Sequence, residues 1–345
     1  MAARVLRPIA IPSIFALVVS LGSSLTAAAA PSCFGRAATI VGTAGEDKIR
    51  GTSGSDVIVG LGGLDNIDGR GGADYICDAK DENYLAGGGG ADHLMGGTTL
   101  DGGPGPDVLE SEIGLSALDG GSGPDRIIGS GARDRLFGGP GNDFVDGRGG
   151  RDYLIFDFAP RGVEVNLGVS GPQDTNWGTD TIRRVEILEG SKHGDIFIGT
   201  EERDVFFADA GDDELHGHGG DDALYGGEGA NEIFGDAGND LLKGDGRLFG
   251  GDGNDTLEGS KASGELSGGA GDDTITGNRG NDVLTGGEGN DNLQGQKGDD
   301  QLFGEVGNDV LDGGVGEETV GDFGSGGPDV DQCTGLETND GTCEG

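Results

Sequence analysis

A single apolar residue recurs every nine positions along most of this chain, with small or polar residues around it. The nine-residue register runs without a slip over four blocks of six, six, six and eight frames, at residues 42–95, 102–155, 190–243 and 250–321. An aliphatic or aromatic residue fills position eight in all 26 frames. Alternation around that residue predicts a very short strand with one inward side chain. A period this short predicts a solenoid in which each repeat forms one small coil.

The first six positions of each frame predict the turn between strands. Gly fills position one in 23 frames and position four in 21, where positive φ or close backbone approach favours it. Asp fills position six in 21 frames, at the junction of loop and strand. The six-residue units 96–101 and 244–249 keep a strand leucine, Leu100 and Leu248. They predict coils with a shortened loop.

Residues 156–189 interrupt the register, and we expect a longer coil or a lateral hairpin there. Leu188 already falls in phase with the block that follows. Trp177, the only tryptophan, lies near the tip of this insertion. An exposed tryptophan marks a binding spot in some proteins, but a packing role is the favoured interpretation.

Composition and charge change the picture in two ways. With 78 Gly and 10 Pro in 345 residues, a chain without periodicity would be expected to be disordered, and the unbroken period argues against this. The formal net charge of −41 disfavours nucleic acid and acidic membrane surfaces as partners. A solvated acidic polymer is the simplest alternative, but most of the acid sits at one repeat position. Stacked carboxylates of one sign need a cation between them.

The chemistry of the repeat favours calcium. Ca²⁺ takes six to eight hard oxygens from carboxylates and backbone carbonyls in a flexible cage, whereas Mg²⁺ demands a tighter octahedron. Zinc and iron are disfavoured because nitrogen and sulfur ligands are scarce. His216 and His218 are either a small transition-metal site or solvated loop residues. An Asp that only caps a turn explains one repeat but not a column of them.

Several frames come close to Gly-Gly-x-Gly-x-Asp-x-apolar-x, among them 138–146, 226–234, 250–258, 268–276 and 286–294. This pattern resembles the repeat-in-toxin (RTX) family of haemolysin-type calcium-binding repeats, and the resemblance covers residues 42–332. It implies an all-β fold, a parallel β-roll solenoid with two nonapeptides, about 18 residues, per turn. Two short parallel sheets would enclose the position-eight residues. Ca²⁺ ions would lie between the loops of successive turns.

The resemblance also implies which side chains bind the multiple Ca²⁺ ions. The implied ligands are Asp47, Asp56, Asp65, Asp74, Asp92, Asp107, Asp125, Asp143, Asp152, Asp213, Asp222, Asp240, Asp255, Asp273, Asp282, Asp291, Asp300 and Asp309. Position six departs from Asp at Asn83, Ser116, Asn231, Gly264 and Glu318. Position four departs from Gly in five frames, among them those with Ala132, His193, Glu202 and Ala262. We expect weak or empty sites in those frames.

The ends of the chain predict export. Residues 1–29 combine two arginines, an apolar stretch and a small-residue cleavage site, which is typical of a secretory signal peptide. An uncleaved membrane anchor is the alternative, and no later segment is apolar enough to span a bilayer. The expected organisation is a signal peptide at 1–29, an N-terminal cap at 30–41, β-roll blocks at 42–155 and 190–321 around the insertion 156–189, and a C-terminal cap at 322–345.

Four cysteines in an exported chain predict two disulfides. We expect Cys33 to pair with Cys77 and Cys333 with Cys343, because the open ends of a solenoid need caps. The sequence alone permits three pairings.

Catalytic motifs are missing from the sequence. It contains no His-Glu-x-x-His, no Gly-x-Ser-x-Gly and no phosphate-binding loop. The prediction is a secreted, non-catalytic calcium-binding protein whose β-roll folds on binding Ca²⁺. A calcium-stiffened adhesin or structural rod with a cell-surface or polysaccharide partner is the main alternative. An enzyme of parallel β-helix type or an enzyme-associated module is a further alternative, as is an ice-binding solenoid, for which only Thr274-Ile275-Thr276 has the expected pattern.

Overall fold

The position-eight residues lie at the centres of short strands that pair with the frame after next. In the computed structural model Ile49 is opposite Ile67 and Ile67 is opposite Leu85, a step of 18 residues each time. Ile58 and Ile76 pair in the same way on the other side of the coil. Two nonapeptides therefore make one turn, and the described residues contain no helix. The predicted parallel β-roll is confirmed.

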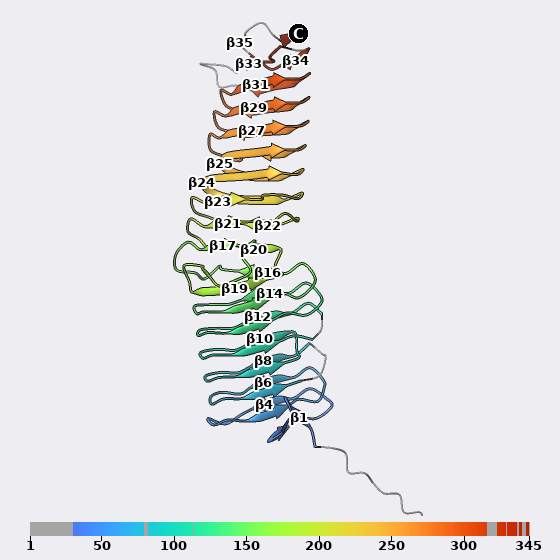
Figure 1. The fold of residues 1–345 in the computed structure, drawn as a ribbon, viewed down its shortest axis with the longest axis vertical. Helices are drawn as coiled ribbons and strands as arrows, with labels where there is room; N and C mark the ends of the chain where they lie inside the picture. Colours follow the sequence, from blue (N-terminus) through green and yellow to red (C-terminus); the bar gives the residue numbers. More distant parts are fainter. Residues whose placement is uncertain are drawn as a thin grey trace, which may run out of the picture. The chain divides into compact units, whose positions relative to one another are not determined.

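The structure describes residues 30–78, 82–112, 114–315, 323–328, 330–336, 338–339 and 343–344. The coils belong to the compact unit Pro31–Gly345, in which successive turns stack on one another (Figure 1). The predicted signal peptide, residues 1–29, lies outside the described residues.

Each turn contributes one strand to each of two parallel ladders. Before and across the insertion, the first ladder contains β4 (Lys48–Arg50), β6 (Asn66–Asp68), β8 (Tyr84–Ala86), β10 (Thr99–Asp101), β12 (Ala117–Asp119), β14 (Arg135–Phe137), β16 (Tyr153–Ile155), β20 (Ile187–Glu189) and β22 (Val205–Phe207). The second contains β3 (Ile40–Val41), β5 (Val57–Val59), β7 (Tyr75–Cys77), β9 (His93–Met95), β11 (Val108–Glu110), β13 (Arg126–Ile128), β15 (Phe144–Asp146) and β19 (Thr179–Arg183).

Both ladders continue to the end of the described chain. The second resumes within the insertion with β17 (Glu164–Asn166) and continues with β21 (Ile196–Ile198) and β23 (Glu214–His216). The long strands β24 (Ala223–Ala237) and β25 (Leu241–Asp252) take part in both ladders. The first then runs through β26 (Thr256–Glu258), β28 (Thr274–Arg279), β30 (Asn292–Lys297), β32 (Val310–Val315), β34 (Asp331–Thr334) and β36 (Cys343–Glu344). The second runs through β27 (Glu265–Ala270), β29 (Val283–Glu288), β31 (Gln301–Val306), β33 (Phe323–Ser325) and β35 (Thr338–Asn339).

The core is a narrow line of position-eight side chains between the two ladders. Most of them, from Ile58 to Leu311, are fully buried and belong to one continuous cluster. Phe197 and Phe206 fill this line edge to face, with ring centroids 5.5 Å apart. Leu100 and Leu248 of the six-residue units are also fully buried, so shortening the loop leaves the core register intact.

The insertion keeps one ladder continuous and adds strands to the other. β16 pairs directly with β20, which places Leu188 opposite Leu154. On the other side β19 pairs with β15, and β18 (Gln173–Asp174) runs antiparallel to β19. The segment is thus a hairpin built into the solenoid. Trp177 packs against this core, with its ring centroid 6.4 Å from that of Phe156, as the packing interpretation expects.

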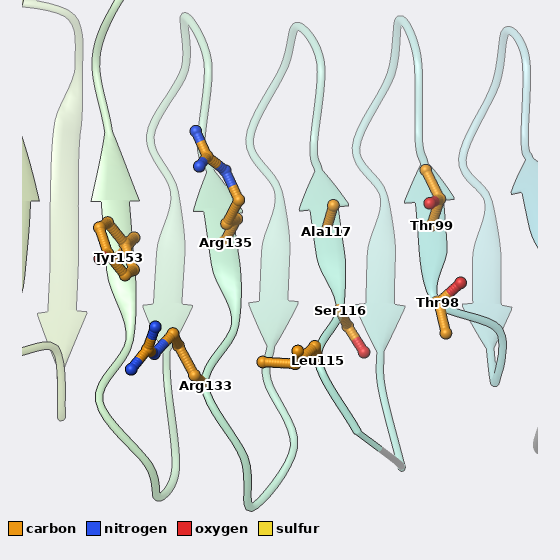
Figure 2. Close-up of a pocket in the computed structure, with 8 residues that line it drawn as sticks. All are labelled: Thr98, Thr99, Leu115, Ser116, Ala117, Arg133, Arg135 and Tyr153. Carbon is orange, nitrogen blue, oxygen red and sulfur yellow. The ribbon is translucent and has the colours of Figure 1, made fainter. Parts of the chain in front are cut away.

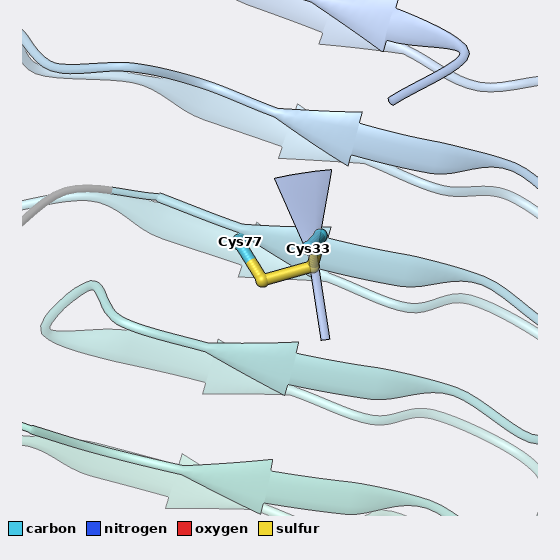
Figure 3. The surroundings of a disulfide bond; sticks show 2 residues. All are labelled: Cys33 and Cys77. Carbon is cyan, nitrogen blue, oxygen red and sulfur yellow. A yellow bond between two sulfur atoms is a disulfide. The ribbon is translucent and has the colours of Figure 1, made fainter. Parts of the chain in front are cut away.

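The N-terminal end is closed by a small hairpin and a disulfide. β1 (Ser32–Cys33) pairs antiparallel with β2 (Arg36–Ala37), and Cys33 is bonded to Cys77 on β7 (Figure 3). Both sulfur-bearing residues are buried beside Val59. The pairing of Cys333 with Cys343 stays a prediction, because the side chain of Cys343 lies outside the described residues.

Removing the Cys33–Cys77 bond is expected to destabilise the calcium-bound protein. The bond joins residues 44 apart, for which the loop-entropy relation gives about 4 kcal/mol of stabilisation as an upper figure. Urea unfolding of a Cys33→Ala, Cys77→Ala variant in saturating calcium should show a lower midpoint. An unchanged midpoint would show that the stacked coils need no cross-link at this end.

Candidate metal centre

The position-six aspartates form columns along the edges of the solenoid, where each loop enters its strand. In most of them one carboxylate oxygen accepts a hydrogen bond from the backbone of the preceding turn. The N–H of Asp56 donates to Oδ1 of Asp74 at 2.7 Å, and the N–H of Asp74 donates to Oδ1 of Asp92 at 2.7 Å. In the second block the N–H of Asp273 donates to Oδ1 of Asp291 at 2.8 Å. The bond fixes each carboxylate between two loops.

The second carboxylate oxygen of most of these residues is buried and receives no hydrogen bond from the described residues. This holds for Oδ2 of Asp65, Asp74, Asp92, Asp107, Asp125, Asp143, Asp152, Asp213, Asp222, Asp240, Asp255, Asp273, Asp282 and Asp291. A buried carboxylate oxygen without a donor is costly, so its regular recurrence indicates a ligand that the protein itself does not supply.

Around most of these oxygens the loop leaves room only for glycine at position one. A Cβ at Gly268 would lie 2.1 Å from Oδ2 of Asp273, and one at Gly286 would lie 2.3 Å from Oδ2 of Asp291. The site is therefore a bare backbone cradle facing a carboxylate. Carboxylate and carbonyl oxygens are the donor set that Ca²⁺ prefers, so the residues fit this ion.

The raised pKa values of the position-six aspartates also indicate a cation as their partner. Burial raises the pKa of Asp143 to about 8, and the carboxylates of Asp180 and Asp125 add to the rise. Burial likewise raises the pKa of Asp107 and of Asp273 to about 7, with neighbouring aspartates contributing. These groups hold their negative charge with difficulty in the fold alone. A divalent cation at Oδ2 would favour the ionised form.

The structure places all 18 predicted ligands at the loop–strand junction, but two of them have a different environment. Oδ2 of Asp56 accepts hydrogen bonds from the backbone N–H and the hydroxyl of Thr52, at 2.6 and 3.0 Å. Thr43 donates to Oδ2 of Asp47 in the same way, at 2.6 and 2.9 Å. In these two frames the second oxygen is already occupied.

Asparagine at position six keeps the structural bond without the charge. Oδ1 of Asn83 accepts from the N–H of Asp65 at 2.6 Å, and Oδ1 of Asn231 accepts from the N–H of Asp213 at 3.1 Å. These substitutions preserve the stacking of the coils and remove one carboxylate from the column.

The sequence analysis did not identify two aspartates that occupy equivalent positions in the structure. Oδ1 of Asp180 accepts from the N–H of Asp143 at 2.8 Å, and Oδ1 of Asp331 accepts from the N–H of Asp309 at 3.0 Å. Oδ2 of Asp331 is buried without a hydrogen bond from the described residues. The signal was present, because both aspartates occupy position six of nonapeptides that begin out of phase, 175–183 and 326–334.

One other acidic cluster lies beside the insertion. Oxygens of Asp157, Glu189 and Asp209 lie within 4.8 Å of one another. These groups are partly or fully exposed, and Glu189 is also 3.7 Å from a guanidinium nitrogen of Arg135. His216 lies 3.0 Å from Glu214 and stacks on Phe234, so its ring is engaged in local contacts.

A cavity of about 450 Å³ opens on the face of the first ladder, over β10, β12, β14 and β16 (Figure 2). Its lining consists of Thr98, Thr99, Leu115, Ser116, Ala117, Arg133, Arg135 and Tyr153. It presents hydroxyls and two guanidinium groups, and no carboxylate or imidazole lines it to act as a general base. The regularly repeated ionisable groups of the described residues lie in the aspartate columns and not in this cavity.

Fold and site together define a parallel β-solenoid with repeated buried carboxylate oxygens along its edges. A comparison with protein families matches the RTX calcium-binding nonapeptide repeat over residues 41–76, 80–99, 119–154, 189–224, 216–246, 243–263, 263–293 and 285–317. The chain belongs to this family, whose repeat implies Ca²⁺ as the bound ion. A comparison with curated proteins gave no match. Within the part of the chain that the structure describes, there is no helix long and apolar enough to cross a membrane.

Proposed function

We propose that this protein is a secreted, non-catalytic calcium-binding protein whose β-roll forms when Ca²⁺ enters the aspartate columns. The observation that carries the proposal is the repeated buried Oδ2, unbonded within the described residues, facing a glycine backbone. Calcium would supply the positive charge that these oxygens lack. The position-six aspartates and the carbonyls of the adjacent loops would hold it.

Binding and folding are one process in this proposal. The groups that enclose a site come from turns 18 residues apart, as the bond from Asp273 N–H to Asp291 illustrates. Such a site does not exist in an open chain, so the binding free energy becomes folding free energy. Extracellular modules commonly bind Ca²⁺ with Kd of about 10⁻⁴ to 10⁻³ M. The chain would thus remain open where calcium is scarce and fold where it is abundant.

Two features favour export. Residues 1–29 have the composition of a signal peptide. The Cys33–Cys77 bond fits an oxidising compartment. We propose residues 30–41 and 322–345 as the caps of the solenoid.

The test is a calcium titration of residues 30–345 by calorimetry, with bound ions counted by atomic emission after equilibrium dialysis. We expect many ions per chain, taken up cooperatively in the range given above. Asp282→Ala should reduce the count and weaken the neighbouring coils, because Asp282 also accepts from the N–H of Gly264 at 2.7 Å. A chain that binds one ion or none would refute the proposal.

A further inference from the structure

The loops of the solenoid fall into two classes that differ at position two. In five frames with Asp at position six, position two is Thr or Ser, and its backbone N–H donates to Oδ2 of that Asp. The pairs are Thr43 with Asp47 at 2.6 Å, Thr52 with Asp56 at 2.6 Å, Ser130 with Asp134 at 2.6 Å, Ser191 with Asp195 at 2.7 Å and Thr200 with Asp204 at 2.7 Å. In each pair the hydroxyl donates to the same carboxylate. We call these the capped loops.

The other class has a different backbone. Position two there adopts a positive φ even when it is not glycine, as in Leu61 at 84°, Arg70 at 77° and Gln296 at 76°. The remaining non-glycine cases are Arg148, Asp209, His218, Asp236, Asn278 and Glu305. A bulky residue is rarely held in this region, so the loop conformation itself is under constraint. We call these the left-handed loops; the position-two Thr and Ser residues of the capped loops do not have positive φ.

The two backbones have opposite consequences for a cation. In a capped loop the positive ends of an N–H and an O–H point at the carboxylate, and they occupy lone pairs that a metal would need. In a left-handed loop such as that of Asp273, Oδ2 stays buried without a hydrogen bond from the described residues. In a capped loop the hydroxyl and the amide N–H therefore supply the positive charge density that a cation would otherwise supply to the carboxylate.

We infer that calcium binds only at left-handed loops, and that Asp47, Asp56, Asp134, Asp195 and Asp204 belong to coils that are closed without metal. The inference rests on the proposed function and sharpens it, because it removes Asp47 and Asp56 from the ligands that the family pattern implies. Residues 42–59 and 190–207 are each a complete turn with both loops capped. They are the first turns of the β-roll blocks 42–155 and 190–321.

The first test counts bound calcium in matched variants. Asp56→Asn is expected to leave the number of ions per folded chain unchanged, whereas Asp273→Asn should lower it by at least one. Far-UV circular dichroism confirms that the counted chains are folded. A wild-type chain that binds no calcium would refute the proposed function. A loss at Asp56→Asn equal to that at Asp273→Asn would instead refute this inference alone.

The second test converts one class into the other. Thr52→Gly turns residues 51–59 into Gly-Gly-Ser-Gly-Ser-Asp-Val-Ile-Val, which fits the full family pattern. We expect this variant to bind about one ion more than the wild type. Thr52→Ser keeps the hydroxyl and should not change the count. A folded Thr52→Gly chain with an unchanged count would overturn the inference; should that variant not fold, Thr43→Gly gives the same comparison in the neighbouring frame.

Discussion

Chelating calcium from residues 30–345 is expected to abolish the β-sheet circular dichroism of the protein. The fold buries a carboxylate in almost every frame, and the second oxygen of most of them receives no hydrogen bond from the described residues. The chain carries a formal net charge of −41, so the stacked coils repel one another once the counter-charge is gone. The apolar core is a single line of side chains and does not compensate for such a loss.

The size of the effect follows from linkage. An ion present at 10 times its Kd stabilises the folded chain by about 1.4 kcal/mol, and this contribution is repeated at every occupied site. About four occupied sites therefore reach the lower end of the roughly 5–15 kcal/mol stability of an ordinary domain, and about eleven reach its upper end.

The measurement is a far-UV spectrum before and after EGTA, with excess calcium added back. Recovery on adding Ca²⁺ but not Mg²⁺ would show that the ion, and not damage, accounts for the change. A spectrum that is the same after exhaustive dialysis against chelator would contradict a calcium-dependent fold.

Much of this fold could be predicted from the sequence because one residue per frame determines it. The position-eight residues specify the core, and Leu100, Leu188 and Leu248 keep that register despite a shortened loop or an insertion. The Cys33–Cys77 bond was also predictable, because it joins the N-terminal segment to the first turns.

The division of the aspartates could not be predicted from the family pattern. That pattern specifies Asp at position six and glycines before it, and says nothing of a hydroxyl at position two. Only the structure shows that the N–H and hydroxyl of Thr52 reach Oδ2 of Asp56. Asp180 and Asp331 were missed for another reason, since their frames begin out of phase with the blocks on either side.

Gly90→Ala is expected to cause a large loss of stability although the residue lies outside the apolar core. Gly90 occupies position four of its frame with φ +152°, and an added Cβ would lie 1.7 Å from the carbonyl oxygen of Gly72 in the preceding turn. The obstacle is backbone and not a flexible side chain, so the two coils would have to separate. We expect the free energy of unfolding to fall by ~3 kcal/mol or more.

The adjacent Gly89 provides the matched control. A Cβ there would meet nothing within 4 Å, and its φ is not positive, so Gly89→Ala should have little effect. Urea unfolding of both variants in saturating calcium makes the comparison. Equal losses in the two would show that backbone flexibility matters and close stacking does not. A loss confined to Gly90→Ala would show that successive coils touch through their backbones. That contact places each loop beside the next, as the proposed calcium sites require.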